Sequence, residues 1–447
     1  MGEQVDVRGG RLRPEEYRRN FDELHPPLDR KRALVDAARC YFCYDAPCVE
    51  ACPTGIDIPR FIRGIQTDNV RGAALTILEA NILGGSCARV CPTEVLCEGA
   101  CVRNAQEGEP VRIGLLQRYA TDWLLDRGEQ PFARAAPTGK RVAVLGAGPA
   151  GLACAHALAR LGHAVTILEK RAKPGGLNEY GIAAYKVPHG FAQAEVDFVL
   201  GLGGIEVRHG VELGRDVHLH DLRRDHDAVF VGCGLQGTNA LGLPEERLEG
   251  VLDAVDYIAA LRQAEDVSRL PVGRDVLVIG GGNTAIDIAI QARRLGAETV
   301  MIAYRRGPEQ MGATIWEQEL AQVNGVRIRH WAMPVRLVGE DGQVRAVELE
   351  RTREEDGRLV GTGERFAVRV DQVFKAIGQR LVPGELDGAA ELLEVAGGKV
   401  VVDGERRTSL KGVWAGGDAV ASGPDLTVAA VEDGKIAARS IHQHITG

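Results

Sequence analysis

The stretch RVAVLGAGPAGLACAHALARLGHAVTILEK, residues 141–170, predicts a strand, a tight turn, a helix and a second strand in direct succession. Within GAGPAG, the first glycine permits the sharp bend, the second lets a pyrophosphate approach the backbone, and the third allows close helix–strand packing. The second strand ends in an acid suited to accept hydrogen bonds from ribose hydroxyls. This combination predicts a dinucleotide site whose candidate contacts are Gly146, Gly148, Pro149, Ala150, Gly151 and Glu169.

A second unit of the same order and spacing follows in RDVLVIGGGNTAIDIAIQARRLGAETVMIAYRR, residues 274–306. Its second strand ends in two arginines instead of an acid. A carboxylate would favour the 2′-hydroxyl of NAD, whereas a guanidinium offers a bidentate partner for the 2′-phosphate of NADPH. The residues thus favour NADP over NAD, unless the arginines are simply exposed. The candidate contacts are Gly280, Gly282, Asn283, Thr284, Arg305 and Arg306.

The segments around these units predict one Rossmann-like domain inserted into another. Residues 227–236 and 370–380 each read as a strand ending in a glycine turn, and residues 407–445 read as strand, glycine-rich turn and helix. The fold class is therefore α/β, with two nested Rossmann-like domains preceded by an α-helical domain. The expected boundaries are 1–138 for the helical domain, 139–272 with 380–447 for the first nucleotide domain, and 273–379 for the second.

Eight of the ten cysteines lie in the predicted helical domain, in the order C-x2-C-x4-C-x3-C-P and then C-x3-C-P-x4-C-x3-C. Loops that supply several thiolates, with a cysteine before proline at the end of a run, are typical of iron–sulfur clusters. The same short spacings also suit tetrahedral zinc. The nucleotide units favour iron–sulfur, because zinc does no redox chemistry.

Composition narrows the class of protein. The chain has 447 residues, of which 45% are hydrophobic and 26% charged, with a net charge of −8 and no long block of one sign. These values are ordinary for a globular enzyme and do not indicate nucleic-acid or membrane binding. The first residues contain no apolar signal region, and no run of about 18 apolar residues occurs. We therefore expect a cytoplasmic chain, in which clustered cysteines bind metal rather than form disulfides.

Two cysteine-containing segments of the chain resemble segments of known enzymes. CYFCYDAPCVEACPTGIDIPRFI (40–62) and CARVCPTEVLCEGACVRNAQEGEPVRIGLLQRYA (87–120) resemble the N-terminal region of dihydropyrimidine dehydrogenase and, less closely, the small subunit of glutamate synthase. The similarity runs from about Arg39 to the C-terminus. It implies two [4Fe–4S] clusters with interleaved ligands: Cys40, Cys43, Cys48 and Cys101 for one, and Cys52, Cys91, Cys97 and Gln117 for the other. Cys87 is then left over as a small buried residue, and Cys154 and Cys233 are expected to be packing residues.

The resemblance also implies FAD in the first nucleotide domain. GVWAGGDAV (412–420) is similar to the flavoprotein segment whose aspartate meets the ribityl and phosphate end of FAD, and PGGLNEYGIAAYKVP (174–188) to the segment beside the isoalloxazine ring. A lysine in that segment is either a flavin neighbour or a surface residue. The implied contacts are Gly176, Leu177, Lys186, Gly417, Asp418 and Thr427.

These expectations describe the electron-input half of an enzyme. We find no catalytic acid and no segment of the roughly 250 residues that an FMN-binding barrel would need. The resemblance implies that electrons from NAD(P)H leave through FAD and the clusters to a partner subunit that contains FMN and iron–sulfur and reduces uracil or thymine. The alternatives are a glutamate synthase small subunit, a ferredoxin- or sulfide-linked NADPH reductase and, in another class, a zinc-stabilised nucleotide-sensing regulator.

Overall fold

The computed structural model describes residues 6–382 and 393–447, which fold into two compact units. Unit 1 comprises Met1–Leu24, Tyr180–Pro188 and Thr238–Gln379, and unit 2 comprises His25–Glu179, His189–Gly237 and Arg380–Gly447. Each unit is built from segments that are distant in the sequence, as a nested arrangement requires. Within the described residues, no helix is both long and apolar enough to cross a membrane.

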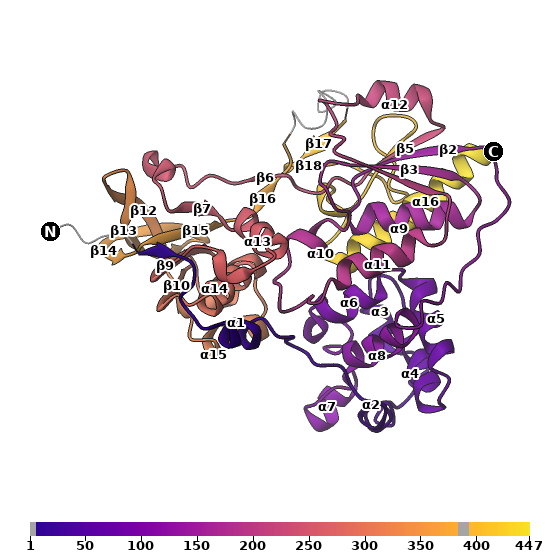
Figure 1. Cartoon of the computed structure of the whole chain (residues 1–447), viewed down its shortest axis with the longest axis horizontal. Coiled ribbons are helices and arrows are strands. Elements are labelled where there is room, and N and C mark those ends of the chain that lie inside the picture. The colour runs from indigo at the N-terminus through magenta and orange to yellow at the C-terminus, as the bar shows by residue number, and fades with distance from the viewer. Residues whose placement is uncertain (1–5, 383–392) are drawn as a thin grey trace. The chain divides into compact units, whose positions relative to one another are not determined.

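Unit 2 contains a parallel five-stranded sheet in the order β19-β5-β2-β3-β4. Helices α9 and α16 lie on one face and α12 on the other (Figure 1). Because both faces are covered, the central strands are apolar throughout rather than alternating; all four residues of β5 are buried. The elements are β2 (Arg141–Leu145), α9 (Pro149–Arg160), β3 (Ala164–Glu169), α11 (Phe191–Leu200), β4 (Ile205–His209), α12 (Leu219–Asp225), β5 (Ala228–Val231), β19 (Val413–Ala415) and α16 (Thr427–Thr446).

The cysteine-bearing segment of unit 2 is helical. Its helices are α2 (Arg30–Ala37), α3 (Pro47–Glu50), α4 (Ile58–Gln66), α5 (Val70–Ala80), α6 (Gly84–Val90), α7 (Arg103–Glu107) and α8 (Ile113–Leu125). Helix α4 starts at a cap in which Asp57 accepts a hydrogen bond from the backbone of Arg60, and it buries Ile58, Phe61, Ile62 and Ile65 on one face. That face belongs to the same hydrophobic core as the inner strand β2 and helix α9.

Unit 1 contains a second parallel five-stranded sheet, in the order β11-β10-β9-β15-β7. A three-stranded antiparallel sheet, β12-β13-β14, belongs to the same unit. The elements are β7 (Val251–Asp253), α13 (Ala254–Gln263), β9 (Asp275–Gly280), α14 (Asn283–Arg294), β10 (Thr299–Ala303), α15 (Ile315–Val323), β11 (Arg327–Arg329), β12 (Ala332–Glu340), β13 (Gln343–Glu355), β14 (Arg358–Arg369) and β15 (Gln372–Ala376).

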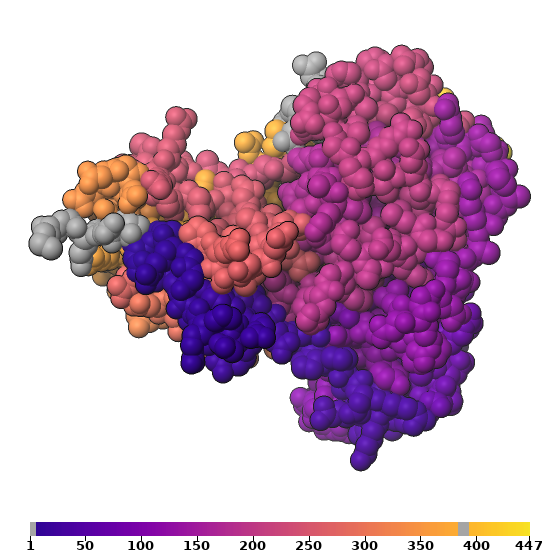
Figure 2. Space-filling view, viewed as in Figure 1, coloured from indigo at the N-terminus to yellow at the C-terminus, as the bar shows by residue number. Residues whose placement is uncertain are grey.

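The N-terminal segment also belongs to unit 1. Strand β1 (Val7–Arg8) pairs with β8 (Val272–Gly273), and helix α1 (Pro14–Asn20) buries Tyr17, whose hydroxyl donates to the Leu295 carbonyl. Figure 2 shows this segment, coloured indigo, spread over the surface of the unit.

The α/β class and the two nested Rossmann-like sheets confirm the sequence-based expectation, but the unit boundaries differ from the expected domain boundaries. Residues 238–272 were assigned to the first nucleotide domain, yet they lie in unit 1 because β7 pairs with β15, more than a hundred positions later in the chain. The helical segment from His25 onward shares a unit with the first nucleotide sheet, because their apolar residues form one core.

Replacing Gly434 by alanine is expected to lower the midpoint of thermal unfolding, although alanine is favoured over glycine inside a helix by about 1 kcal/mol. Gly434 lies where α16 crosses α9, and a Cβ there would stand 2.2 Å from the Ala150 carbonyl oxygen. Overpacking of this kind costs about 1–3 kcal/mol. Gly423→Ala is the control, since no described atom lies within 4 Å of its new Cβ. A G434A protein as stable as the wild type would contradict this packing.

Candidate functional site

Four cysteines line one cavity in the helical segment of unit 2. They are supplied by the loop after α2, by α3 and by the turn before α7, and they are Cys40, Cys43, Cys48 and Cys101. Burial, with the neighbouring thiols, raises the pKa of Cys48 to about 12, and burial likewise raises the pKa of Cys40. Thiolates grouped in this way need a positive partner, and a bound metal supplies one because it deprotonates its thiol ligands.

Another cavity gathers Cys52, Cys91, Cys97 and Gln117, together with Cys87. Hydrogen bonding to the Cys87 thiol, and then burial, raises the pKa of Cys91 well above its ordinary value. Gln117 on α8 donates from Nε2 to the Gly84 carbonyl at 2.7 Å, which leaves Oε1 as its available electron donor. Sequence reasoning left Cys87 out of the site, but the structure places this buried thiol in the cavity.

The donors in these cavities fit a polynuclear cluster. Within residues 6–382 and 393–447, no three histidine, cysteine or carboxylate side chains are placed to hold a single metal ion. Tetrahedral zinc needs four donors at about 2.0–2.3 Å from one ion. A four-iron cluster has no such requirement, because each iron binds its own protein ligand. The cavities supply thiols and one amide, donors that an iron–sulfur cluster can use, and thiols can also bind zinc.

The first glycine-rich turn, between β2 and α9, is held by close backbone contacts. Gly146 has φ +92°, and a Cβ there would lie 2.6 Å from the Gly232 carbonyl oxygen. A Cβ at Gly151 would lie only 2.0 Å from the Gly146 carbonyl oxygen. Around Gly148 the structure is open, with the nearest described atom, Cα of Gly176, 3.8 Å from such a Cβ. Since α9 starts at Pro149, this open space adjoins a helix N-terminus, which suits a pyrophosphate.

Glu169, at the end of β3, is buried and bound to the backbone. Its Oε2 accepts from the Ala147 N–H at 2.8 Å and its Oε1 from the Arg171 N–H at 2.8 Å. The carboxylate thus fixes the glycine-rich turn, a role that the motif did not reveal. Each oxygen keeps a second lone pair, so a ribose hydroxyl can still donate to Glu169.

The C-terminal turn of unit 2 places Gly417 and Asp418 just before α16. Burial, followed by the charges of Asp425 and Asp433, raises the pKa of Asp418 to about 6. Asp433, which the sequence reasoning missed, accepts from the Gly417 N–H at 2.8 Å and pairs with Arg406 at 2.6 Å. The only signal for Asp433 was its place nearly two turns into the final helix.

The segment 174–188 is divided between the units. Gly176 and Leu177 lie in unit 2, where Asn178 accepts from the Thr427 hydroxyl at 3.0 Å. Lys186 lies in unit 1 and is buried.

Lys186 pairs with Asp287 at 2.7 Å and with Glu317 at 2.5 Å. Burial alone would lower the pKa of Lys186, but the two carboxylates outweigh it and raise the pKa. The surface-lysine alternative is therefore wrong, and contact with a flavin stays a prediction.

The second glycine-rich turn, between β9 and α14, repeats the geometry of the first. Gly280 has φ +147°, and a Cβ there would meet the Ala376 carbonyl oxygen at 2.1 Å, whereas Gly282 faces open space among the described atoms. Helix α14 begins at Asn283 and Thr284. After β10, Arg305 and Arg306 are exposed, and their carbonyls accept from the Thr352 hydroxyl and the Trp331 N–H. Backbone anchoring with exposed guanidinium groups suits recognition of an anion.

Comparison with known proteins agrees with this arrangement. A family described as dihydropyrimidine dehydrogenase domain II, 4Fe-4S cluster, matches residues 17–129, and the pyridine nucleotide-disulphide oxidoreductase family matches residues 133–434. The structure of FprA from Mycobacterium tuberculosis in complex with NADPH has a TM-score of 0.57 at 21% identity, over 69% of this chain and 85% of FprA. That likeness shows the fold.

Two curated relatives align along nearly the whole chain. The NAD-dependent dihydropyrimidine dehydrogenase subunit PreT of Escherichia coli (strain K12) is 35% identical over 427 residues, covering 96% of this chain and 98% of PreT. The glutamate synthase (NADPH) small chain of the same organism is 33% identical over 446 residues, covering 94% and 93%. The chain therefore belongs to the pyridine nucleotide-disulphide oxidoreductase family and, with its 4Fe-4S domain, is an NAD(P)-dependent flavin oxidoreductase related to PreT and the glutamate synthase small chain.

Proposed function

We propose that this chain is the NAD(P)H-oxidising subunit of a two-subunit dihydropyrimidine dehydrogenase. The observation that carries the proposal is the presence of two cysteine-lined cavities in the same compact unit as the first Rossmann-like sheet. When bound, FAD accepts hydride from NAD(P)H and iron–sulfur clusters carry single electrons, so these groups supply the redox chemistry. The chain supplies their positions, and the 35% identity to PreT supports the pyrimidine substrate.

Each cavity would hold one [4Fe–4S] cluster. The first would be bound by Cys40, Cys43, Cys48 and Cys101, which line one cavity. The second would take Cys52, Cys91, Cys97 and the Oε1 atom of Gln117. Gln117 is favoured over Cys87 as the fourth ligand because its amide is oriented by the Gly84 carbonyl.

Unit 2 would bind FAD and the second glycine-rich turn of unit 1 would bind the nicotinamide nucleotide. Gly146, Gly148 and the start of α9 would bind the FAD pyrophosphate, with Glu169 on the ribose and Asp418 at the ribityl end. Gly280, Gly282 and the start of α14 would bind the other pyrophosphate, and Arg305 and Arg306 would select NADPH. The relatives are named for different nucleotides, NAD for PreT and NADPH for the glutamate synthase small chain.

The partner would be an FMN- and iron–sulfur-containing catalytic subunit that reduces uracil or thymine. The first cavity is a suitable exit for electrons because Tyr41, which lines it, is half exposed and the nearby Tyr44 is fully exposed. Aromatic side chains of this kind are enriched in protein interfaces. We place the chain in the cytoplasm, where grouped thiols stay reduced and available to iron.

A glutamate synthase small chain is the second candidate function. The relative of that name aligns over 94% of this chain at an identity only two points lower than PreT. In that case the electrons would pass to a large amidotransferase subunit, and oxidation of the nucleotide would depend on glutamine and 2-oxoglutarate.

Anaerobically prepared protein is expected to contain about eight iron and about eight sulfide ions per chain, as two four-iron clusters require. Replacing Gln117 by alanine should alter the electron paramagnetic resonance (EPR) signal of one cluster and leave the other unchanged. Cys87→Ser is the matched control, because this thiol lies in the same cavity but is not a proposed ligand. Bound zinc with negligible iron would contradict the cluster proposal. An EPR signal that changes in C87S but not in the Gln117 variant would identify Cys87, rather than Gln117, as the fourth ligand.

Replacing Arg305 by glutamine should reduce kcat/KM for NADPH far more than for NADH. Loss of a charge-assisted hydrogen bond to the 2′-phosphate costs about 1.5–3 kcal/mol, or roughly ten- to hundredfold. Arg358→Gln, at another exposed arginine of unit 1, should leave the preference unchanged. Equal losses for both nucleotides, or a wild-type enzyme that prefers NADH, would show that Arg305 does not select for the phosphate.

The isolated chain is expected to oxidise NAD(P)H with ferricyanide, because hydride transfer to a flavin needs only the two nucleotide sites. Uracil or thymine should accelerate this oxidation only after an FMN-containing catalytic subunit is added. Steady-state rates with and without that subunit provide the measurement. Uracil-dependent oxidation by the chain alone would refute the two-subunit proposal, and dependence on glutamine with an amidotransferase subunit would establish the second candidate.

A further inference from the structure

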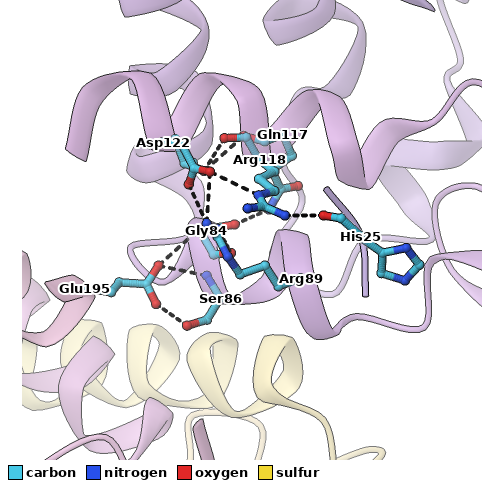
Figure 3. Close-up of polar contacts among 10 residues, drawn as sticks. His25, Gly84, Ser86, Arg89, Gln117, Arg118, Asp122 and Glu195 are labelled. Atoms are coloured by element: carbon cyan, nitrogen blue, oxygen red, sulfur yellow. Dashed lines mark hydrogen bonds and ion pairs between the residues drawn. The ribbon is translucent and has the colours of Figure 1, made fainter. Parts of the chain in front are cut away.

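A buried carboxylate from outside the cysteine segment contacts the start of α6, the helix that leads to Cys91 (Figure 3). Glu195 of α11 is only 2% exposed. Its Oε1 accepts from the backbone N–H groups of Gly85 and Ser86 at 2.9 and 3.0 Å, and its Oε2 accepts from the Ser86 hydroxyl. Burial raises the pKa of Glu195 to about 7, while the bonds from Ser86 favour the charged form.

A single peptide group connects this carboxylate with the second cavity. The peptide between Gly84 and Gly85 donates its N–H to Glu195 and accepts at its carbonyl from Nε2 of Gln117. A carboxylate on the N–H side polarises the peptide, so its carbonyl becomes a stronger acceptor for the Gln117 amide. The same polarisation makes Oε1 of Gln117, which is the atom left for iron, a better electron donor.

The approach of Glu195 depends on the absence of a side chain at position 85. A Cβ on Gly85 would lie 2.5 Å from the Phe191 ring and 2.9 Å from Oε1 of Glu195. The ring of Phe191 also packs on the guanidinium of Arg89, 3.5 Å from the ring centre, and Arg89 pairs with Asp122 of α8 at 2.9 Å. Helix α6 is thus held between α11 and α8, and its first peptide has little freedom to turn.

We propose that Glu195 is a positioning residue for the second cluster, acting through the Gly84–Gly85 peptide to orient and polarise Gln117. This inference rests on the proposed function, in which Gln117 is a ligand of that cluster. The ionised carboxylate increases the electron-donating strength of Gln117 and therefore stabilises the oxidised cluster. Removing its charge raises the reduction potential of the second cluster and affects the first cluster, which has its own cavity, much less.

The test is the Glu195→Gln variant of the whole chain, prepared anaerobically with its clusters. Glutamine keeps the shape of the side chain and can still accept from Gly85, but it carries no charge. At a pH above the pKa of Glu195, an EPR-monitored redox titration should show an upward shift in the potential of the second cluster only. Iron and sulfide contents should equal those of the wild type.

Asp122→Asn is the matched control, because it removes one negative charge on the other side of α6 without contacting the Gly84–Gly85 peptide. The reduction potential of the second cluster should shift less in D122N than in E195Q. If E195Q does not fold, Glu195→Asp provides the second variant, since it keeps the charge but withdraws it from the peptide, and it should shift the same potential upward. In a Gln117→Cys background the effect of E195Q should disappear, as a coupling through Gln117 requires.

An E195Q shift no larger than that of D122N, or equal in both clusters, would overturn the positioning role. The iron content would then still support the proposed function. Wild-type protein that binds no iron would instead overturn the proposed function itself, so the two failures are distinguishable.

Discussion

The close approach of three backbone segments around the first turn of α9 is the constraint on which unit 2 depends. Gly151 lets α9 pack against the turn that precedes it, and Gly434 lets α16 cross α9 at the Ala150 carbonyl. Gly417 also lies close, since a Cβ there would lie 3.2 Å from Cβ of Ala150. Larger side chains at these positions would separate the segments and loosen their packing.

Buried carboxylates recur in unit 2 at the turns that border the candidate cofactor sites. Glu169 accepts from Ala147, Asp433 from Gly417, and Glu195 from Gly85. A buried charge is costly unless it is hydrogen-bonded, and backbone N–H groups in a sharp turn need acceptors. Each pairing meets both needs and holds the local backbone in one conformation.

The sequence predicted much of the fold and of the candidate site because the relevant signals are local. Both strand–turn–helix units, the final strand–turn–helix and the helical cysteine segment lie where the periodicity and glycine spacing indicated. The compact unit begins at Thr238 rather than near the expected boundary at residue 272, because β7 pairs with a strand far along the chain. No sequence pattern predicted that Lys186 would pair with Asp287 and Glu317, since these carboxylates belong to separate segments of the chain.

The sequence by itself determined the order of elements, the two glycine-rich turns and the types of donor available to metal. Backbone preferences, hydrophobic periodicity and short spacings act over a few residues, so they can be read from a linear chain. Only the tertiary structure decided that Cys87 shares a cavity with Cys52 and Gln117 and that Glu195 meets the peptide bound by Gln117. These contacts join segments up to 110 residues apart. They depend on how whole helices pack in a common core, for which no local pattern exists.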